Sequence, residues 1–286
     1  MPLTQLRDGD LRLPKRKANT HKGDYGKLLV LGGCVGYTGA PTLCARAALR
    51  AGAGLVYLGV PAPIYDITAV KNDEAMPFPL PADECGCFAA AAADAITAQL
   101  EMCDVAAIGP GMGKAPGCAA LLERVMADFA KPLVIDADGL NMLAGRMELL
   151  RGRRAMTVLT PHDGEFLRLG GTLDGDRADC ALRFAQAHGC VLVLKGHRSV
   201  VAFPDGTAFI GTHGNPGMAK GGSGDVLTGV IAAMLCQLPQ EKAVSAGVHL
   251  HALAGDLCAQ RLGEYAMLAT DVIETLPAAT QIMMED

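Results

Sequence analysis

The chain has 286 residues, of which 50% are hydrophobic and 19% are charged, so its composition excludes an intrinsically disordered protein. Its 25 basic and 30 acidic residues give a formal net charge of −5, which argues against a general nucleic-acid binder, because such proteins present a basic surface. The apolar stretches are interrupted before they reach the roughly 18 residues of a membrane span, and the first residues lack the apolar core of a signal peptide. We therefore expect a cytoplasmic protein without membrane contact.

Short apolar runs alternate with amphipathic segments as far as residue 194, which predicts an α/β fold. The runs predict strands at 27–31, 55–60, 105–108, 133–135, 156–159 and 191–194. The segments between them predict helices near 40–52, 86–100, 115–129, 138–150 and 176–188. Because most of the strands are apolar throughout, we expect a mostly parallel central sheet with helices on both faces.

The pattern changes after residue 194. Two short strands are predicted at 198–203 and 206–210, joined by a turn at Pro204-Asp205-Gly206, and two long helices are predicted near 223–237 and 241–262. The chain shows no internal repeat and no long linker. We therefore expect residues 21–286 to form one domain, preceded by a charged lead-in at residues 1–20.

Ten cysteines are scattered through the chain without the paired spacing of a metal site. Several of them lie in apolar runs, so we expect reduced and mostly buried thiols. Cys85-Gly86-Cys87 is the one close pair, and the sequence does not assign it a role.

The most informative segment runs from Asn215 to Gly229 and reads NPGMAKGGSGDVLTG. Apolar residues recur with a helical period from residue 226 onward, so a helix is expected to begin near 222–225. Gly221, Gly222 and Gly224 allow a sharp turn that gathers unpaired N–H groups at the positive end of this helix. The segment therefore predicts a phosphate site, although it is not a Walker P-loop.

Asp225 lies in the first turn of that predicted helix. One interpretation is that its carboxylate stabilises the helix dipole. The other is that Asp225 is a general base, which takes the proton from a hydroxyl group that attacks the bound phosphate. We favour the base, because a carboxylate beside a phosphate site otherwise only repels the ligand.

Other candidate residues follow predicted strands, where ligands bind in open α/β sheets. The glycines of 32–39 and 109–113 either bring the backbone close to a ligand or form tight turns. Asp136 and Asp138 follow the strand at 133–135, and they either contact magnesium through water or, in the case of Asp138, cap a helix. His162 and Glu165 share a face where another helix is expected to begin. Lys195, expected to be exposed, follows the strand at 191–194 and suits a nucleotide phosphate.

Taken together, these motifs resemble the ADP-dependent NAD(P)H-hydrate dehydratases, a branch of the ribokinase-like superfamily. The resemblance covers residues 21–262, and its most specific motif is the last one. The matching segments are HKGDYGKLLVLGG (21–33), GYTGAP (36–41), GAGLV (52–56), IGPGMG (108–113), VIDADGLN (134–141), LTPHDGE (159–165), VLKG (193–196) and GNPGMAKGGSGDVLTG (214–229).

The resemblance implies a ribokinase-like three-layer α/β/α sandwich and a carbon–oxygen lyase that repairs nicotinamide nucleotides. The S form of hydrated NADH or NADPH carries a hydroxyl group on C6 of the nicotinamide ring. The enzyme would phosphorylate that hydroxyl from ADP, with Mg²⁺ as cofactor, and eliminate phosphate to restore NAD(P)H, releasing AMP. The resemblance also implies a homo-oligomer, a tetramer by analogy, and an epimerase on a separate chain.

The resemblance implies site residues as well, with Asp225 as the catalytic base. The residues matching the anion hole are Gly222, Ser223 and Gly224. The residues matching the hydrate-binding positions are Ala40, Gly113, His162 and Asp225. The residues matching the nucleotide-binding positions are Lys195, Gly196, His197, Arg198, Ser199 and Gly224. Glu165 matches the position near magnesium, where the contact could run through water.

The chain departs from the family pattern at Cys34, where relatives often have Ser. The sequence does not decide between ADP and ATP, or between the hydrates of NADH and NADPH. Two alternatives stay open. The first is a ribokinase-like kinase for a vitamin precursor, which would release its phosphoester rather than eliminate phosphate. The second is a nucleotide-binding regulator without activity, which the intact glycine turn and Asp225 disfavour.

Overall fold

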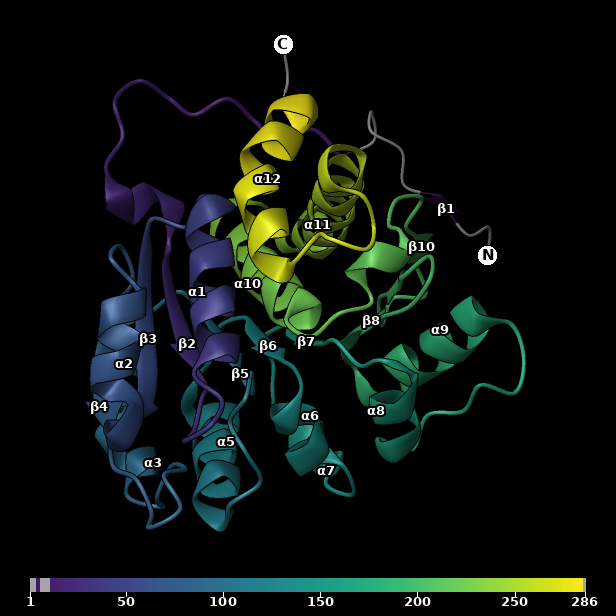
Figure 1. Ribbon diagram of the computed structural model, residues 1–286. Helices are drawn as coiled ribbons and strands as arrows, with labels where there is room; N and C mark the ends of the chain where they lie inside the picture. The colour runs from purple at the N-terminus through teal and green to yellow at the C-terminus, as the bar shows by residue number, and fades with distance from the viewer. Residues whose placement is uncertain (1–3, 6–10, 285–286) are drawn as a thin grey trace.

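The structure is a computed structural model that describes residues 4–5 and 11–284. In this part of the chain, ten strands form one sheet in the order β1-β10-β9-β8-β7-β6-β5-β2-β3-β4 (Figure 1). Neighbouring strands run parallel except for β9, which is antiparallel to both β8 and β10. The strands are β1 (Thr4–Gln5), β2 (Lys27–Leu31), β3 (Leu55–Pro61), β4 (Met76–Leu80), β5 (Val105–Ile108), β6 (Leu133–Ile135), β7 (Thr157–Leu159), β8 (Val191–Leu194), β9 (Val200–Ala202) and β10 (Ala208–Ile210).

Helices cover both faces of this sheet. The helices are α1 (Gly39–Arg50), α2 (Tyr65–Lys71), α3 (Ala92–Ala95), α4 (Thr97–Met102), α5 (Pro116–Asp128), α6 (Asp138–Leu143), α7 (Glu148–Arg151), α8 (Asp163–Arg168), α9 (Arg177–His188), α10 (Ser223–Gln237), α11 (Gln240–Leu262) and α12 (Ala269–Met283). In Figure 1, α1, α10, α11 and α12 gather on one side of the sheet, and α5 to α9 lie on the other.

Two apolar cores separate the three layers. Leu28 and Val30 of β2 point into the core beneath α1 and α10–α12, whereas Leu29 and Leu31 point into the core beneath α3–α9. This alternation follows from the period of two along a strand, and it explains why central strands must be apolar on both faces. The arrangement confirms the predicted α/β/α sandwich with a mostly parallel sheet.

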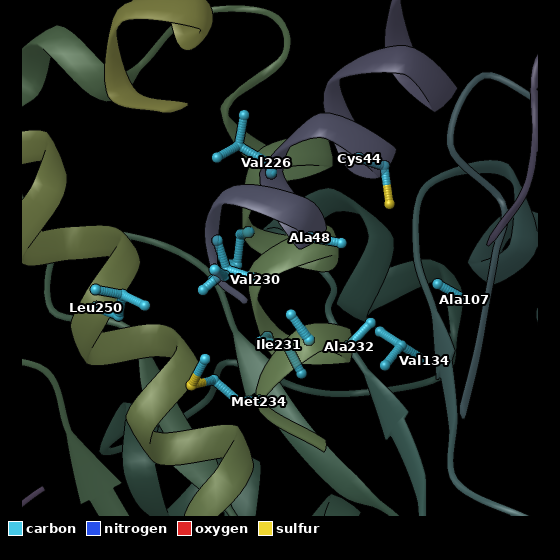
Figure 2. Close-up of a cluster of buried hydrophobic side chains, with 14 of the residues drawn as sticks. Cys44, Ala48, Ala107, Val134, Val226, Val230, Ile231, Ala232, Met234 and Leu250 are labelled. Atoms are coloured by element: carbon cyan, nitrogen blue, oxygen red, sulfur yellow. The ribbon is translucent and has the colours of Figure 1, made fainter. Parts of the chain in front are cut away.

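Helix α10 is buried on nearly all sides between α1, α11 and the sheet (Figure 2). A Cβ atom at Gly229 would lie 2.1 Å from the carbonyl oxygen of Cys44, so only glycine permits this close approach of α1 and α10. Gly247 of α11 packs in the same way against the backbone of Ile231. The core therefore fixes the position of α10, and with it the glycine turn at its start.

Most predicted elements are confirmed to within two residues, but two predicted helices need correction and several elements were missed. The helix expected at 86–100 begins only at α3, because residues 82–88 form a turn closed by a bridge between Ala82 and Phe88. The helix expected at 138–150 is divided into α6 and α7. The prediction missed β4, α2 and α12, and β1 lies within the predicted lead-in.

The predicted lead-in of residues 1–20 lies partly outside the described residues. Within the described part, β1 pairs with β10, and the Leu13 N–H donates to the carbonyl oxygen of Met283. Seven of the ten cysteines are buried, and Cys85 is exposed. None of the helices in the described ranges has the length and apolar character needed to cross a membrane.

Candidate active site

The candidate site lies where the parallel strands end. The strands β8, β7, β6, β5 and β2 are neighbours in the sheet in this order. They run parallel, so their carboxyl ends meet at one edge. Helix α10 begins near the same edge, since Gly224 adjoins Lys195, which follows β8, and Asp136, which follows β6. This edge is the usual ligand position of open α/β sheets.

The glycine turn has the conformation that its sequence predicts. Gly222 has φ 98°, a backbone conformation in which any residue with a side chain would be strained, and a Cβ atom there would also lie 2.7 Å from Leu43 Cδ1. Gly221 is exposed, with open space where a Cβ atom would be. No side chain in the described part of the chain caps α10. The Ser223 N–H donates to the Lys220 carbonyl oxygen at 3.3 Å, which leaves the N–H groups of Gly222 and Gly224 for a ligand.

Lys220 attaches the turn to the loop before α12. Its Nζ donates to the carbonyl oxygens of Tyr265 and Met267 at 2.6 and 2.8 Å. The turn is therefore held from both sides, by the packing of Gly222 and by these two hydrogen bonds.

Lys195 is the central cation of the site. Its Nζ lies 2.8 Å from Asp136 Oδ1, 3.6 Å from Glu165 Oε2 and 3.4 Å from the Cβ position of Gly224. Burial alone would lower the pKa of Lys195, but the two carboxylates raise it above its ordinary value, so the side chain stays charged. The expectation of an exposed lysine was wrong, because the side chain is only 18% exposed.

Asp136 connects the lysine to α10. Its Oδ2 accepts a hydrogen bond from Thr228 Oγ1 at 2.7 Å, one helical turn after Gly224. The carboxylate is buried, and both oxygens are engaged by these two partners. The sequence analysis did not single out Thr228, although a hydroxyl residue in a helix that is otherwise apolar was the available signal.

Asp225 has the perturbed acidity expected of a base. Burial, followed by repulsion from Asp136, raises the pKa of its carboxyl group to about 7, and Lys195 only partly opposes this. Among the described residues, no hydrogen-bond donor engages the carboxylate. The group is half-buried rather than turned into the core, so it can accept a proton from a ligand near neutral pH.

Asp138 does not cap a helix, which was one of the two roles considered for it in the sequence analysis. The residue at the start of α6 is Ala137, with φ 48°, and no described side chain caps this helix, so the capping interpretation was wrong. Asp138 Oδ2 instead accepts a hydrogen bond from the Gly113 N–H at 2.9 Å. Asp138 thus holds the loop after β5, and Asn141 supports it with a hydrogen bond of 3.3 Å.

His162 is the N-terminal cap of α8. Its Nδ1 accepts hydrogen bonds from the N–H groups of Gly164 and Glu165 at 3.0 and 3.3 Å, so Nε2 carries the proton of the neutral ring. Glu165 Oε2 accepts in return from the His162 N–H at 2.8 Å, which completes a capping box. The ring is exposed, and Glu165 is buried beside Lys195.

Arg177 holds the loop from Lys195 to Ser199 in place through a hydrogen bond to its backbone. The Arg177 guanidinium donates to the Lys195 carbonyl oxygen at 2.6 Å and pairs with Asp163. His197 and Arg198 are exposed on this loop, and they are not brought into contact with the Lys195 ammonium group. The sequence analysis did not identify Arg177, whose position depends on the fold.

Ala40 lies on the other side of the site, at the start of α1. A Cβ atom at Gly111 would lie 3.0 Å from the Ala40 side chain, which shows that the start of α1 touches the loop after β5. The Gly33 N–H donates to the Pro110 carbonyl oxygen at 2.9 Å in the same contact. The structure thus joins Ala40, Gly113, Asp138, Lys195 and Asp225 along one edge of the sheet.

Within the described ranges, no three His, Cys, Asp or Glu side chains converge to hold a metal ion. Mg²⁺ needs no such cage, because it is commonly held by one or two carboxylates together with water and substrate phosphates. Two cavities, of about 880 and 510 Å³, lie elsewhere, at the far ends of α1 and α10 and beside β9 and β10. Neither cavity is lined by a residue of this site. The site is therefore identified from the hydrogen bonds, ion pairs and close approaches of its own residues.

The three-layer sandwich with a glycine turn at the start of α10 defines a ribokinase-like protein. A solved structure from Enterococcus faecalis V583, described as a ribokinase-like superfamily protein, matches with a TM-score of 0.85 at 27% identity, covering 99% of this chain and 96% of that one. A family model described as NAD(P)H-hydrate dehydratase matches residues 28–278, and the chain belongs to this family.

Sequence matches to named relatives support the assignment of the chain to this family. A bifunctional NAD(P)H-hydrate repair enzyme from Moorella thermoacetica is 44% identical over 96% of this chain and 53% of its own length. This chain therefore spans about half the length of that relative. An ADP-dependent (S)-NAD(P)H-hydrate dehydratase from Neisseria meningitidis is 34% identical over 96% of this chain and 92% of its own.

A solved structure adds to this comparison. The ADP/ATP-dependent NAD(P)H-hydrate dehydratase from Bacillus subtilis, co-crystallized with ATP and Mg²⁺, has a TM-score of 0.87 and 32% identity, covering 99% of both chains.

Proposed function

We propose that this protein dehydrates the S form of hydrated NADH and NADPH, using ADP as phosphoryl donor and releasing AMP and phosphate. The single observation that carries the proposal is the position of the half-buried Asp225 carboxylate in the first turn of α10, which no described side chain caps. A base and an anion site at one point suit phosphoryl transfer to a hydroxyl group. Membership of the family supports the choice of substrate.

Asp225 would act first. Its carboxylate takes the proton from the C6 hydroxyl of the hydrate while that oxygen attacks the terminal phosphorus of ADP, so the bond to the leaving AMP breaks. The C6–O bond then breaks and phosphate leaves with its electron pair. A proton is lost from C5, and the C5–C6 double bond forms. Phosphorylation is needed because phosphate is a far better leaving group than hydroxide.

The anion hole would hold the transferring phosphoryl group. We assign this role to the N–H groups of Gly222, Ser223 and Gly224. The core fixes α10, so those of Gly222 and Gly224 need no reorganisation, whereas the Ser223 N–H would share its donor with the Lys220 carbonyl oxygen. Lys195 would add positive charge at the same point, since its ammonium group lies 3.4 Å from the Cβ position of Gly224. Asp136 and Glu165 keep that ammonium group charged and oriented.

The two ligands would lie on opposite sides of the anion hole. We assign the hydrate to Ala40, Gly113 and His162, with the Nε2–H of His162 available as a donor. The nucleotide would contact the backbone and exposed side chains of the loop formed by Gly196, His197, Arg198 and Ser199. Because the Lys195 side chain is already paired, its contact with the nucleotide would be limited to the phosphates.

Magnesium would arrive with the nucleotide phosphates. Glu165 is the residue we assign to it, through water, because its Oε2 already accepts the His162 N–H and its carboxylate is buried. When bound, Mg²⁺ would neutralise charge on the phosphates. We also propose a homo-oligomer, a tetramer by analogy, and an epimerase supplied by a separate chain.

The test is a recovery assay with hydrated NADH as substrate and ADP or ATP in parallel samples. Return of the near-ultraviolet absorbance of reduced nicotinamide, dependent on ADP and with equimolar AMP, is the expected result. A vitamin-precursor kinase would leave the hydrate unchanged and yield a stable phosphoester from an alcohol substrate. A nucleotide-binding regulator would bind ADP without turnover.

A further inference from the structure

Two thiol groups meet beside the proposed hydrate position. The Cys34 and Cys87 side chains lie close enough for one thiol to perturb the other. A Cβ atom at Gly113 would lie 3.0 Å from Cys87 Sγ and 3.6 Å from Cys34 Sγ, so both sulfur atoms pack directly against this glycine. Cys34 follows β2, whereas Cys87 follows β4, and therefore only the fold brings the two residues together.

The backbone fixes both thiols in this position. The Cys87 carbonyl oxygen accepts from the Asp83 N–H at 2.8 Å, and Asp83 Oδ1 accepts from the Cys87 N–H at 2.9 Å. The Val35 N–H donates to the Gly86 carbonyl oxygen at 3.2 Å, which attaches the loop that carries Cys34 to the turn that carries Cys87. The two thiols therefore form a preorganised pair rather than a chance encounter of mobile side chains.

We propose that Cys34 and Cys87 are a thiol modification site, at which a peroxide forms a reversible disulfide that slows turnover at the adjoining site. Cys87 is the more accessible of the two, so it would be oxidised first to a sulfenic acid, with one water released from hydrogen peroxide. The Cys34 sulfur would then attack that sulfenic acid, forming the disulfide and releasing a second water. In total, two thiols lose two hydrogen atoms and one peroxide becomes two waters.

Burial is consistent with this order of events. Burial, together with the smaller effect of the neighbouring Cys87, raises the pKa of the Cys34 thiol to about 12. Cys34 is therefore a poor first target for a peroxide, which reacts with thiolates. Cys85 is exposed two residues away and is the natural competitor, which makes it the appropriate control.

The disulfide would affect turnover through Gly113. Two sulfur atoms in a disulfide are about 2 Å apart, much closer than two thiols in contact, so oxidation draws the loops after β2 and β4 together. Gly113 packs against both sulfur atoms and is held by Asp138, so it must shift with them. This part of the inference rests on the proposed function, in which Gly113 contacts the hydrate.

The experiment treats the reduced full-length chain with hydrogen peroxide, blocks free thiols, and maps disulfide-linked peptides by mass spectrometry. The hydrate-recovery assay is run on the same samples before and after treatment with dithiothreitol. We expect a Cys34–Cys87 linkage and a roughly tenfold fall in kcat/KM, since a displacement of about 1 Å at a reaction site costs up to a hundredfold. Dithiothreitol should reverse both changes.

Two variants provide the controls. Cys87→Ser should keep its activity under peroxide, whereas Cys85→Ser should respond as the unchanged protein does. The proposal would be overturned if no disulfide-linked Cys34–Cys87 peptide formed at peroxide doses that oxidise Cys85. It would also be overturned if the protein with the Cys34–Cys87 disulfide had an unchanged kcat/KM. If the reduced protein does not restore NADH at all, the proposed function is wrong, but the peptide map still decides whether the thiol pair is a modification site.

Discussion

The Nζ atom of Lys195 lies 2.8 Å from Oδ1 of Asp136, and this buried ion pair connects the end of β8 to the end of β6. Asp136 in turn accepts a hydrogen bond from Thr228 of α10. The pair therefore couples the sheet to the helix that carries the glycine turn. It also places one positive charge among several carboxylates, where phosphate would otherwise be repelled.

Replacing Lys195 by methionine should destabilise the protein by about 3–5 kcal/mol, because removal of one partner leaves Asp136 buried without its counter-charge. Chemical denaturation at neutral pH measures this change. The double variant Lys195→Met with Asp136→Asn is the matched control, and it should regain part of the loss. If the double variant is as unstable as the sum of both single variants, the two residues are not coupled.

Asp225→Asn should stabilise the protein at alkaline pH. The folded-state pKa of about 7 lies above the ordinary value of 3.8 for an aspartate, so the carboxylate costs stability as pH rises between these values. The free energy of unfolding of the variant should therefore equal that of the original protein near pH 4. Above pH 7 it should be higher by at most roughly 4 kcal/mol. Denaturation curves over this pH range measure the difference, and a difference independent of pH would contradict the assigned acidity.

The fold could be predicted from sequence wherever a strand is apolar on both faces, as in β2, β5 and β8. The prediction missed β4, because Pro77 and Pro79 argue against a strand, yet an edge strand tolerates prolines. It missed α12, which contains Pro277. Packing of these elements against β3 and α11 decides their structure, and such contacts are not visible in a local pattern.

The candidate site was only partly predictable. The glycine turn and Asp225 follow from local spacing, and the structure places them as expected. Lys195 was expected to be exposed because its partners, Asp136 and Glu165, are 59 and 30 residues away in sequence. The hydrogen bond of Asp138 to Gly113 likewise depends on the order of β5 and β6 in the sheet.

Asp138→Ala should raise KM for the hydrate about tenfold and change kcat less, since it removes a charge-assisted hydrogen bond of roughly 1.5–3 kcal/mol from the loop of Gly113. Steady-state kinetics with saturating ADP separate the two constants. Asp138→Asn retains an acceptor and should lose less. An unchanged KM in Asp138→Ala would show that this loop does not hold the hydrate.

His251 should make the protein sensitive to acid. Burial lowers the pKa of this histidine to about 4, so between pH 6.5 and pH 4 the unfolded chain takes up a proton that the folded protein does not. The free energy of unfolding should therefore fall by up to about 3 kcal/mol over this range. His251→Leu should remove this part of the pH dependence, and parallel slopes for both proteins would contradict it.

The pH dependence of kcat/KM reports on the free enzyme. In the proposed mechanism Asp225 must be deprotonated to accept the hydroxyl proton, so kcat/KM should rise tenfold per pH unit below about pH 7 and level off above it. Rates with ADP over pH 5–9 measure the profile, after correction for ionisation of the nucleotide. A profile that stays flat through pH 7 would exclude Asp225 as the titrating base.

The most direct measurement of the central claim is the rate at which Asp225→Asn restores NADH from its hydrate with saturating ADP. The variant preserves the size of the side chain, and its ADP affinity can be measured separately to show that the anion hole is intact. Loss of a general base predicts a fall in kcat of about a hundredfold to ten-thousandfold with ADP binding retained. Turnover within a few-fold of the original enzyme would contradict the account.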